Sequence, residues 1–390
     1  MNDSDGRWAW AEVDPAAIEH NVAVVRAAAG GVPVWAVVKA DGYGHGALVA
    51  AEAALHGGAA GLCVALVQEG VQLRNVGVSA PVLVFGEQPP AELDAAVRNG
   101  LTSTVYSLRQ VAALDAVACA AGMVHPVHLK IDSGMHRVGC NPDDALSIAA
   151  AVGAAPGLRL EGVYSHLAVA DEPDHPVTAE QVAVFDAVLA RLADAGIHPP
   201  LVHLANSAGA LAHPSARRSL VRPGIALYGI SPGAGVDRHA AALRPALSLH
   251  ARVSMVRRVR AGEGISYGLR HTFSTDTTVA VLPIGYADGV PRRLFAVGAE
   301  VLLGGCRRPI VGVVTMDQMM VDMGDDDVAV GDRAVLIGRQ GDDEITAVEW
   351  ADLLGTIGYE IVCGISRRIE RRVTWPMAPT LGADHAPVGD

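Results

Sequence analysis

Short apolar runs alternate with helix-type stretches from residue 15 to about residue 230 of this 390-residue chain. The runs are continuous, as in strands that are covered on both faces. Eight occur, at residues 34–38, 61–66, 81–85, 101–106, 126–131, 160–165, 201–204 and 219–221. Helix-type stretches follow them and precede the first, at residues 15–28, 48–56, 91–99, 108–121, 142–151 and 178–195. Eight strand-then-helix units predict an α/β fold with an N-terminal (β/α)8 TIM-like barrel over residues 1–240, and a doubly wound sheet is the alternative.

The pattern changes after about residue 240, where short β-type runs are separated by Gly and Asp and only residues 347–357 have a helical pattern. The runs fall at residues 253–259, 278–283, 300–303, 308–314, 319–322 and 333–337. They predict a mainly β C-terminal domain over residues 241–375, with which the first residues of the chain can pair. Residues 376–390, rich in Pro, Ala and Gly, are expected to form a flexible tail.

The composition narrows the classes of protein. The net charge is −12 and no Lys/Arg-rich run occurs, which argues against a nucleic-acid partner. No apolar stretch is long enough to span a bilayer, and the polar N-terminus lacks the pattern of a secretion signal, so we expect a cytoplasmic protein without a membrane partner. The five cysteines form no Cys-x-x-Cys pair, so neither a metal site nor a disulfide framework is indicated, and most are expected to be small buried hydrophobic residues.

Charged and polar residues follow several of the predicted strands. In a TIM barrel, the carboxyl ends of the strands form the active site. The ends of the runs and the residues just past them give Lys39, Lys130, Arg137, His166, Asn206, Ser207 and Arg222, of which Lys130 lies within the fifth run. Cations gathered at one rim are costly without an anionic ligand. The pattern therefore predicts an anion-binding site at this end of the barrel.

Lys39 has the features of a Schiff-base lysine. It follows four apolar residues, so its amine is expected to emerge from an environment of low dielectric constant. Burial and neighbouring cations lower the pKa of a lysine and free its lone pair for reaction with a carbonyl. A surface lysine after a strand is the alternative.

A phosphate site is predicted after the seventh and eighth runs, at Ser207 and the turn formed by residues 222–225. Barrels commonly bind phosphate at this place through backbone N–H groups. Gly224 would let the backbone approach an oxygen closely. An ordinary Arg-Pro-Gly turn is the alternative.

Residues 42–47, Gly-Tyr-Gly-His-Gly-Ala, match a dinucleotide-binding pattern, with Glu69 at the distance expected for a ribose contact. This match makes a nicotinamide-dependent dehydrogenase a rival interpretation. However, Lys39, Ala40 and Asp41 intervene between the strand and the first glycine, and eight units fit a closed barrel better. A tight Gly-rich turn is the third interpretation.

Nine sequence blocks, taken together, resemble the alanine racemase family of pyridoxal-phosphate (PLP) enzymes. The resemblance extends from Val13 to about Arg372 and begins with AVVKADGYGHG around Lys39. The other blocks follow in order: KIDSGMHRVG, YSHLAVAD, NSAG, RPGIALYG, GISYG, PIGYADGVPRR, TMDQ and IGYE. The resemblance implies a barrel followed by a β domain, in a head-to-tail homodimer whose active sites are shared across the interface.

The resemblance also implies the roles of individual residues. Lys39 would hold PLP through a Schiff base and act as one catalytic base, and Tyr267 of the partner subunit would be the second. Arg222 would face the pyridine nitrogen, with His166 packed by the ring and bonded to Arg222. The remaining cofactor contacts would be Tyr43, Asn206, Ser207, Gly224, Ile225 and Tyr359.

Other implied residues handle the substrate. Arg137 and the backbone of Met316 would contact the substrate carboxylate, and Lys130 matches a lysine that is often carbamylated. Asp171, Arg292 and Asp317 would line the substrate corridor. The reaction would be interconversion of L-alanine and D-alanine, and whether the product serves the cell wall, catabolism or antibiotic tolerance stays open.

The chain departs from the family pattern at two positions. Val313 stands where the family usually has a corridor arginine, and Gly358 stands where it often has asparagine. The first change leaves substrate size open, so racemisation of serine or of a broader range of amino acids is an alternative. Two further alternatives are another barrel-type PLP enzyme, such as a decarboxylase or aldolase, and a PLP-homeostasis protein without turnover. Arg222 argues against the former, and the β domain with Tyr267 argues against the latter.

Overall fold

The computed structural model describes residues 6–374, which divide into two compact units. The barrel unit comprises residues 16–42 and 47–244, and the β unit comprises residues 6–15, 43–46 and 245–374. Among the described residues, no helix combines the length and the apolar character needed to cross a bilayer.

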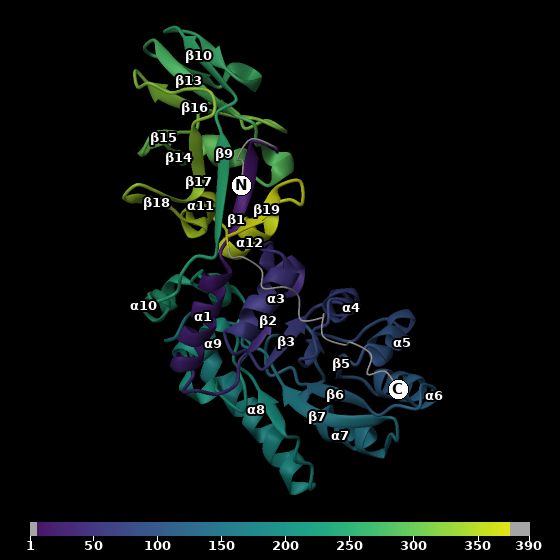
Figure 1. The fold of residues 1–390 in the computed structure, drawn as a ribbon. Coiled ribbons are helices and arrows are strands. Elements are labelled where there is room, and N and C mark those ends of the chain that lie inside the picture. The colour runs from purple at the N-terminus through teal and green to yellow at the C-terminus, as the bar shows by residue number, and fades with distance from the viewer. Residues whose placement is uncertain (1–5, 375–390) are drawn as a thin grey trace, which may run out of the picture. The chain divides into compact units, whose positions relative to one another are not determined.

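The barrel unit contains a parallel sheet in which seven strands lie in chain order from β2 to β8 (Figure 1). The strands are β2 (Trp35–Val37), β3 (Gly61–Val64), β4 (Val82–Val84), β5 (Thr102–Val105), β6 (His125–Lys130), β7 (Leu158–Tyr164) and β8 (Leu201–His203). The eighth predicted run forms one parallel bridge, between Val34 and Val221. Ser219 donates to Val202 O (3.0 Å) and Trp35 donates to Val221 O (2.9 Å), so this segment connects β8 to β2. The predicted TIM-like order is confirmed, with the eighth strand reduced to a bridge.

Helices follow the strands, as the sequence pattern predicts. They are α1 (Pro15–Ala28), α3 (Ala47–His56), α4 (Val67–Asn75), α5 (Pro90–Arg98), α6 (Leu108–Ala120), α7 (Ala145–Ala154), α8 (Val177–Asp194) and α9 (Ser207–Ala212). The helices α4 and α9 were not among the predicted stretches. The first contains Gly70 and several polar residues, and the second has only six residues, so neither has a strong helical pattern.

The segment after β2, labelled α2 (Lys39–Tyr43), is a left-handed turn. Ala40, Asp41 and Tyr43 have φ of 53°, 55° and 53°, and Gly42 has 60°. Left-handed backbone costs roughly 1–2 kcal/mol per non-glycine residue. Glu69 helps to hold it, because its carboxylate accepts from the Ala40 N–H at 2.7 Å as well as from Ala65 N at 2.8 Å. The residue that the dinucleotide interpretation assigned to a ribose therefore supports the turn that follows Lys39.

The β unit is built from sheets that join distant parts of the chain. Its largest sheet has the order β15-β14-β17-β9-β1-β19, with β18 paired to β17. These strands are β1 (Ala9–Val13), β9 (Leu247–Arg252), β14 (Glu300–Leu303), β15 (Cys306–Pro309), β17 (Arg333–Gln340), β18 (Asp343–Ile345) and β19 (Glu370–Val373). Strand β1 pairs in parallel with β19 and antiparallel with β9, which places the two ends of the described chain side by side (Figure 1).

Two smaller sheets complete the β unit. One has the order β10 (Met255–Val259), β13 (Thr277–Leu282) and β16 (Met319–Gly324), and the other pairs β11 (Gly264–Ile265) with β12 (His271–Thr272). The helices α11 (Ala347–Leu354) and α12 (Gly358–Gly364) follow β18. The predicted strand at residues 308–314 is wrong beyond Ile310, because β15 ends at Pro309 and only Ile310 continues, as a bridge to Val321.

Both cores are aliphatic, with buried Val, Leu, Ile and Ala predominating. The expectation for the cysteines is wrong: Cys63 and Cys140 are buried, whereas Cys119, Cys306 and Cys363 are exposed, and all five are free thiols. The predicted tail, residues 376–390, lies outside the described residues.

Candidate active site

Four predicted site residues lie at the carboxyl ends of barrel strands. Lys39 follows β2 by two residues, Lys130 ends β6, His166 follows β7 by two residues and Arg222 follows the bridge at Val221. Arg137 lies in the loop after β6. We call these five residues the cationic group.

The members of the cationic group are close enough to change one another's ionisation. Burial, followed by neighbouring positive charges, lowers the pKa of Lys130 to about 8. The charges that act on it are those of Arg222, Arg137 and Lys39, opposed by Asp132. Burial and four positive charges of the group also lower the pKa of His166 well below its ordinary value. Because a bound anion would relieve this repulsion, the group favours an anionic ligand.

Arg222 is the most constrained member of the group. Its side chain is buried, and one guanidinium nitrogen donates to Ser165 O at 2.7 Å and to Leu204 O at 3.2 Å. The guanidinium also lies 5.0 Å from the ring centroid of Tyr164, within cation–π distance. Burial lowers the pKa of Arg222, but an arginine stays protonated at neutral pH, so these contacts hold a fixed positive charge in the barrel.

Arg222 also bonds to a histidine that the sequence pattern does not single out. Arg222 Nη1 donates to Nδ1 of His203 at 2.5 Å, and Nε2 of His203 lies 2.8 Å from Nδ1 of His128. His203 also stacks on Tyr164, with ring centroids 4.7 Å apart and planes within 7°. Neither histidine was predicted as a site residue. His203 is the last residue of β8, three residues before Asn206, and this strand-end position could have identified it as a candidate.

The predicted phosphate-binding residues come together in the barrel unit. The hydroxyl of Ser207 accepts from the backbone N–H of Gly224 at 2.9 Å and of Ala226 at 3.3 Å. Ile225 is fully buried beside them. Asn206 is the N-cap of α9, because its side-chain oxygen accepts a hydrogen bond from the backbone N–H of Gly209 at 2.9 Å.

In the β unit, two predicted cofactor contacts that are far apart in sequence are neighbours. The rings of Tyr43 and Tyr359 have centroids 6.1 Å apart, inclined at 51°. Tyr43 is buried, and its carbonyl oxygen contacts Nδ1 of His45 at 3.0 Å. The close approach of helix α12 requires Gly44, since a Cβ there would lie 2.3 Å from Val362 O.

Tyr267 projects from the β unit. Its side chain is 74% exposed, and it lies between Ser266 and Gly268, whose φ values are 63° and 73°. The Ser266 hydroxyl donates to the carbonyl of Val313 at 2.7 Å. Val313 itself is buried, so an aliphatic side chain packs where the family usually has an arginine, and its backbone supports the turn that presents Tyr267.

The remaining predicted residues are distributed over both units. Met316 and Asp317 share a turn in the β unit, with Met316 half-exposed at 52%, and the exposed Arg292 begins a short 3-10 helix, Arg292–Ala296. Asp171 is half-buried in the barrel unit against Gly233.

The barrel residues fit a cofactor that combines a phosphate with an aldehyde. The cationic group supplies positive charge, the strand-end Lys39 supplies an amine, and Ser207 supplies a hydroxyl around which the backbone N–H groups of Gly224 and Ala226 gather. Within residues 6–374, no cluster of three or more His, Cys, Asp or Glu is arranged to hold a metal ion.

Comparisons with known proteins agree with this chemistry. The family profile "Alanine racemase, N-terminal domain" matches residues 13–232, and "Alanine racemase, C-terminal domain" matches residues 246–373. The alanine racemase of Symbiobacterium thermophilum is 47% identical over 371 residues, which are 95% of this chain and 98% of that protein.

Solved structures give the same result. The alanine racemase of D-cycloserine-producing Streptomyces lavendulae superposes with a TM-score of 0.90 at 37% identity, over 96% of this chain and 99% of that one. The alanine racemase of Bacillus anthracis with bound L-Ala-P has a TM-score of 0.89 at 40% identity, over 94% and 95% of the two chains. The chain therefore belongs to the alanine racemase family of pyridoxal-phosphate-dependent amino-acid racemases.

Proposed function

We propose that the chain interconverts L-alanine and D-alanine by a two-base mechanism. Lys39 exchanges a proton with one face of the substrate Cα, and Tyr267 of the partner subunit exchanges a proton with the other. Racemisation requires proton transfer on opposite faces, which a single base cannot reach. PLP, when bound, supplies the electron sink that acidifies Cα. The observation that carries this proposal is Lys39 at a strand end among the charges of the cationic group.

The exposure of Tyr267 supports a homodimer with shared active sites. A catalytic base that is 74% exposed in one chain needs a second surface to exclude water from it. A cavity of about 840 Å³ adjoins this tyrosine, and Ile265, Val281 and Met320 line part of it. An apolar hollow next to an exposed tyrosine is typical of a surface that another copy of the chain covers.

Cofactor binding is assigned to both units. In the barrel unit, Ser207, Gly224 and Ile225 take the phosphate and Arg222 faces the pyridine nitrogen, with His166 beside the ring. In the β unit, Tyr43 and Tyr359 are assigned to the phosphate. Because Arg222 carries a permanent charge and has no acceptor to offer, it favours an unprotonated pyridine nitrogen, which weakens the electron sink and suppresses transamination. Arg222→Glu should therefore increase formation of the pyridoxamine by-product, and an unchanged by-product yield would contradict this role.

The substrate carboxylate is assigned to Arg137 and the backbone N–H of Met316. Lys130 is proposed to be carbamylated, because a pKa of about 8 leaves a useful fraction of neutral amine at neutral pH and carbamylation would turn a repelled cation into an anion. Mass spectrometry of the native protein with and without bicarbonate tests this, and an unmodified Lys130 in both samples would disprove it.

Alanine is favoured as the substrate because the relatives are alanine racemases and one solved relative contains L-Ala-P. The family's corridor arginine is replaced by the buried Val313, so the corridor formed with Asp171, Arg292 and Asp317 is expected to carry one positive charge fewer. This leaves turnover of serine as the second candidate.

The deciding experiment is incubation of the PLP-loaded protein with each L-amino acid in D₂O. Deuterium exchange at Cα with loss of optical rotation identifies the reaction and the substrate, and no exchange with alanine or serine would disprove the proposal. Borohydride should attach the cofactor to the peptide that contains Lys39. Tyr267→Phe should slow exchange from L-alanine by at least about 100-fold while leaving PLP bound. Tyr106→Phe, in the barrel unit, is the matched control.

A further inference from the structure

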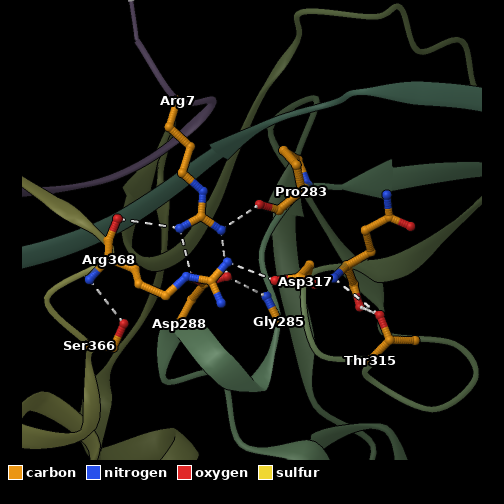
Figure 2. Close-up of polar contacts among 9 residues, drawn as sticks. Arg7, Pro283, Gly285, Asp288, Thr315, Asp317, Ser366 and Arg368 are labelled. Carbon is orange, nitrogen blue, oxygen red and sulfur yellow. Dashed lines mark hydrogen bonds and ion pairs between the residues drawn. The ribbon is translucent and has the colours of Figure 1, made fainter.

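Four charged side chains of alternating sign lie in a row in the β unit, next to the turn formed by residues 315–318. We call them the charge row. Arg7 holds both carboxylate oxygens of Asp288, with contacts of 2.7 and 2.6 Å. Arg368 Nε lies 3.4 Å from the same carboxylate, and Arg368 Nη2 donates to Asp317 at 2.7 Å. Figure 2 shows the two arginine side chains meeting at Asp288, with Arg368 extending from there to Asp317. The order of charges is therefore Arg7, Asp288, Arg368 and Asp317.

Asp288 is the buried member of the charge row. Its side chain is fully buried, and an unpaired carboxylate in that position would be strongly unfavourable. The two arginines and the backbone N–H of Gly285, which donates to Oδ2 at 3.0 Å, satisfy it. Arg7 is also fixed by Pro283 O at 3.2 Å and Arg368 O at 3.3 Å. Arg368 is therefore held at its backbone by Arg7 and at its guanidinium by Asp288.

Residues 285–288 also hold the turn formed by residues 315–318. The N–H groups of Tyr286 and Ala287 donate to Thr315 O and Met316 O, each at 3.0 Å. Gly285 permits this approach, since a Cβ there would lie 2.3 Å from Thr315 O. The turn is closed by Thr315 N, which donates to Gln318 O at 2.9 Å. The two peptide groups on either side of the Met316 Cα, one of which carries the Met316 N–H, are thus tied to one segment through their carbonyls.

A side-chain contact from outside the turn also restrains it. The side chain of Asp317 is 56% exposed and accepts a hydrogen bond from Arg368. Arg368 is 49% exposed and also contacts the buried Asp288, so its guanidinium has little freedom to follow Asp317 outward. The pKa of Arg368 is raised, first by its hydrogen bond to Asp317 and then by the charge of Asp288.

We propose that Arg368, anchored on Asp288, is a positioning residue for the substrate carboxylate. It fixes Asp317, and with it the direction of the Met316 N–H that is assigned to that carboxylate. The inference rests on the proposed function, because it uses the assigned role of Met316. Arg368 touches neither base, so its effect is on substrate binding. Loss of its bond should raise KM and leave the proton-transfer steps unchanged.

The test compares steady-state kinetics of the PLP-loaded protein with L-alanine. Arg368→Gln should raise KM about tenfold, the effect of one lost charge-assisted hydrogen bond, with kcat within about twofold and the visible cofactor spectrum unchanged. Arg368→Lys should recover part of the loss. Since Arg368 acts through Asp317, the double variant with Asp317→Asn should be no worse than the more impaired single variant. Arg258→Gln removes a comparable exposed pair with Asp325, 3.0 Å long, and should leave KM unchanged.

Hydrogen exchange provides a readout that is independent of turnover. Without substrate, the peptide covering residues 315–318 should exchange faster in Arg368→Gln than in the wild type or Arg258→Gln. Unchanged KM and unchanged exchange would overturn the inference, as would equal falls in kcat and kcat/KM together with loss of the cofactor spectrum. If the wild type racemises no amino acid but the exchange difference is present, the proposed function fails and the positioning of the turn stands.

Discussion

Arg222 donates a 2.5 Å hydrogen bond to Nδ1 of His203, and both side chains are buried. A guanidinium has no acceptor, so Nδ1 of His203 must be unprotonated. A neutral imidazole then carries its proton on Nε2, which faces Nδ1 of His128 at 2.8 Å. Burial, and after it the charge of Arg222, lowers the pKa of His203 well below its ordinary value, which agrees with a neutral ring. One contact therefore fixes both the tautomer of His203 and the direction of the guanidinium.

Removing this acceptor should reduce activity. In His203→Leu, Arg222 loses a buried charge-assisted bond, which contributes about 1.5–3 kcal/mol, so kcat/KM for L-alanine should fall at least about tenfold. His203→Asn should retain most of the activity, because its side-chain oxygen can accept near the position of Nδ1. Racemisation kinetics and the visible cofactor spectrum provide the measurement. A leucine variant as active as the asparagine variant would show that Arg222 does not need this acceptor.

The same logic extends to His128. Its Nδ1 accepts from His203, so its proton is expected on Nε2, which lies 3.7 Å from the Glu161 carboxylate. This distance exceeds a hydrogen bond, but the contact lowers the pKa of Glu161, so the interaction is electrostatic. Nitrogen-15 NMR of labelled histidines should show both rings neutral and protonated on Nε2. Glu161→Gln should reduce the population of the Nε2–H tautomer of His128. The His128→Asn variant lacks this ring and therefore shows which signals belong to His128. A predominant Nδ1–H form of either ring in the wild type would contradict the assignment.

The extent to which sequence predicts this protein depends on how local each feature is. The barrel strands were predictable because burial on both faces produces uninterrupted apolar runs. The sequence predicts that the first residues pair with the C-terminal domain, but not which strand they join or in which register. The register depends on residues about 360 positions apart, as in the pair of Trp10 with Glu370. The strand-end rule found Lys39 and Arg222, but His128 lies within a strand, and nothing in a one-dimensional pattern shows that it faces His203.

Buried neutral histidines should make the protein sensitive to acid. Burial lowers the pKa of His125 to about 4, and its Nε2 lies 2.8 Å from Ser103 Oγ. Between pH 6.5 and 4 the unfolded chain binds a proton that the folded chain does not, so the free energy of unfolding falls as the pH decreases through this window. One such group contributes a slope of up to about 1.4 kcal/mol per pH unit.

Denaturant unfolding of the wild type and His125→Gln across that range measures the contribution. Glutamine keeps a hydrogen-bonding side chain but does not titrate, so the slope against pH should become shallower. His136→Gln is the matched control, because the side chain of His136 is 86% exposed. Equal slopes in the wild type and His125→Gln would mean that His125 takes up its proton at its ordinary pKa in the folded protein.

The left-handed turn after Lys39 should be relieved by glycine. Ala40 has φ of 53° and ψ of 48°, a conformation that glycine adopts without the Cβ clash. Its side chain is exposed, so Ala40→Gly loses little packing and should raise the free energy of unfolding by about 0.5–1 kcal/mol, after the entropy gained by the unfolded chain. Ala23→Gly, at an exposed position in the middle of α1, should instead lower it by about 1 kcal/mol. Denaturation midpoints of the two variants should move in opposite directions, and a fall in both would show that the Glu69 and Asp41 contacts, not the residue type at 40, determine the stability of the turn.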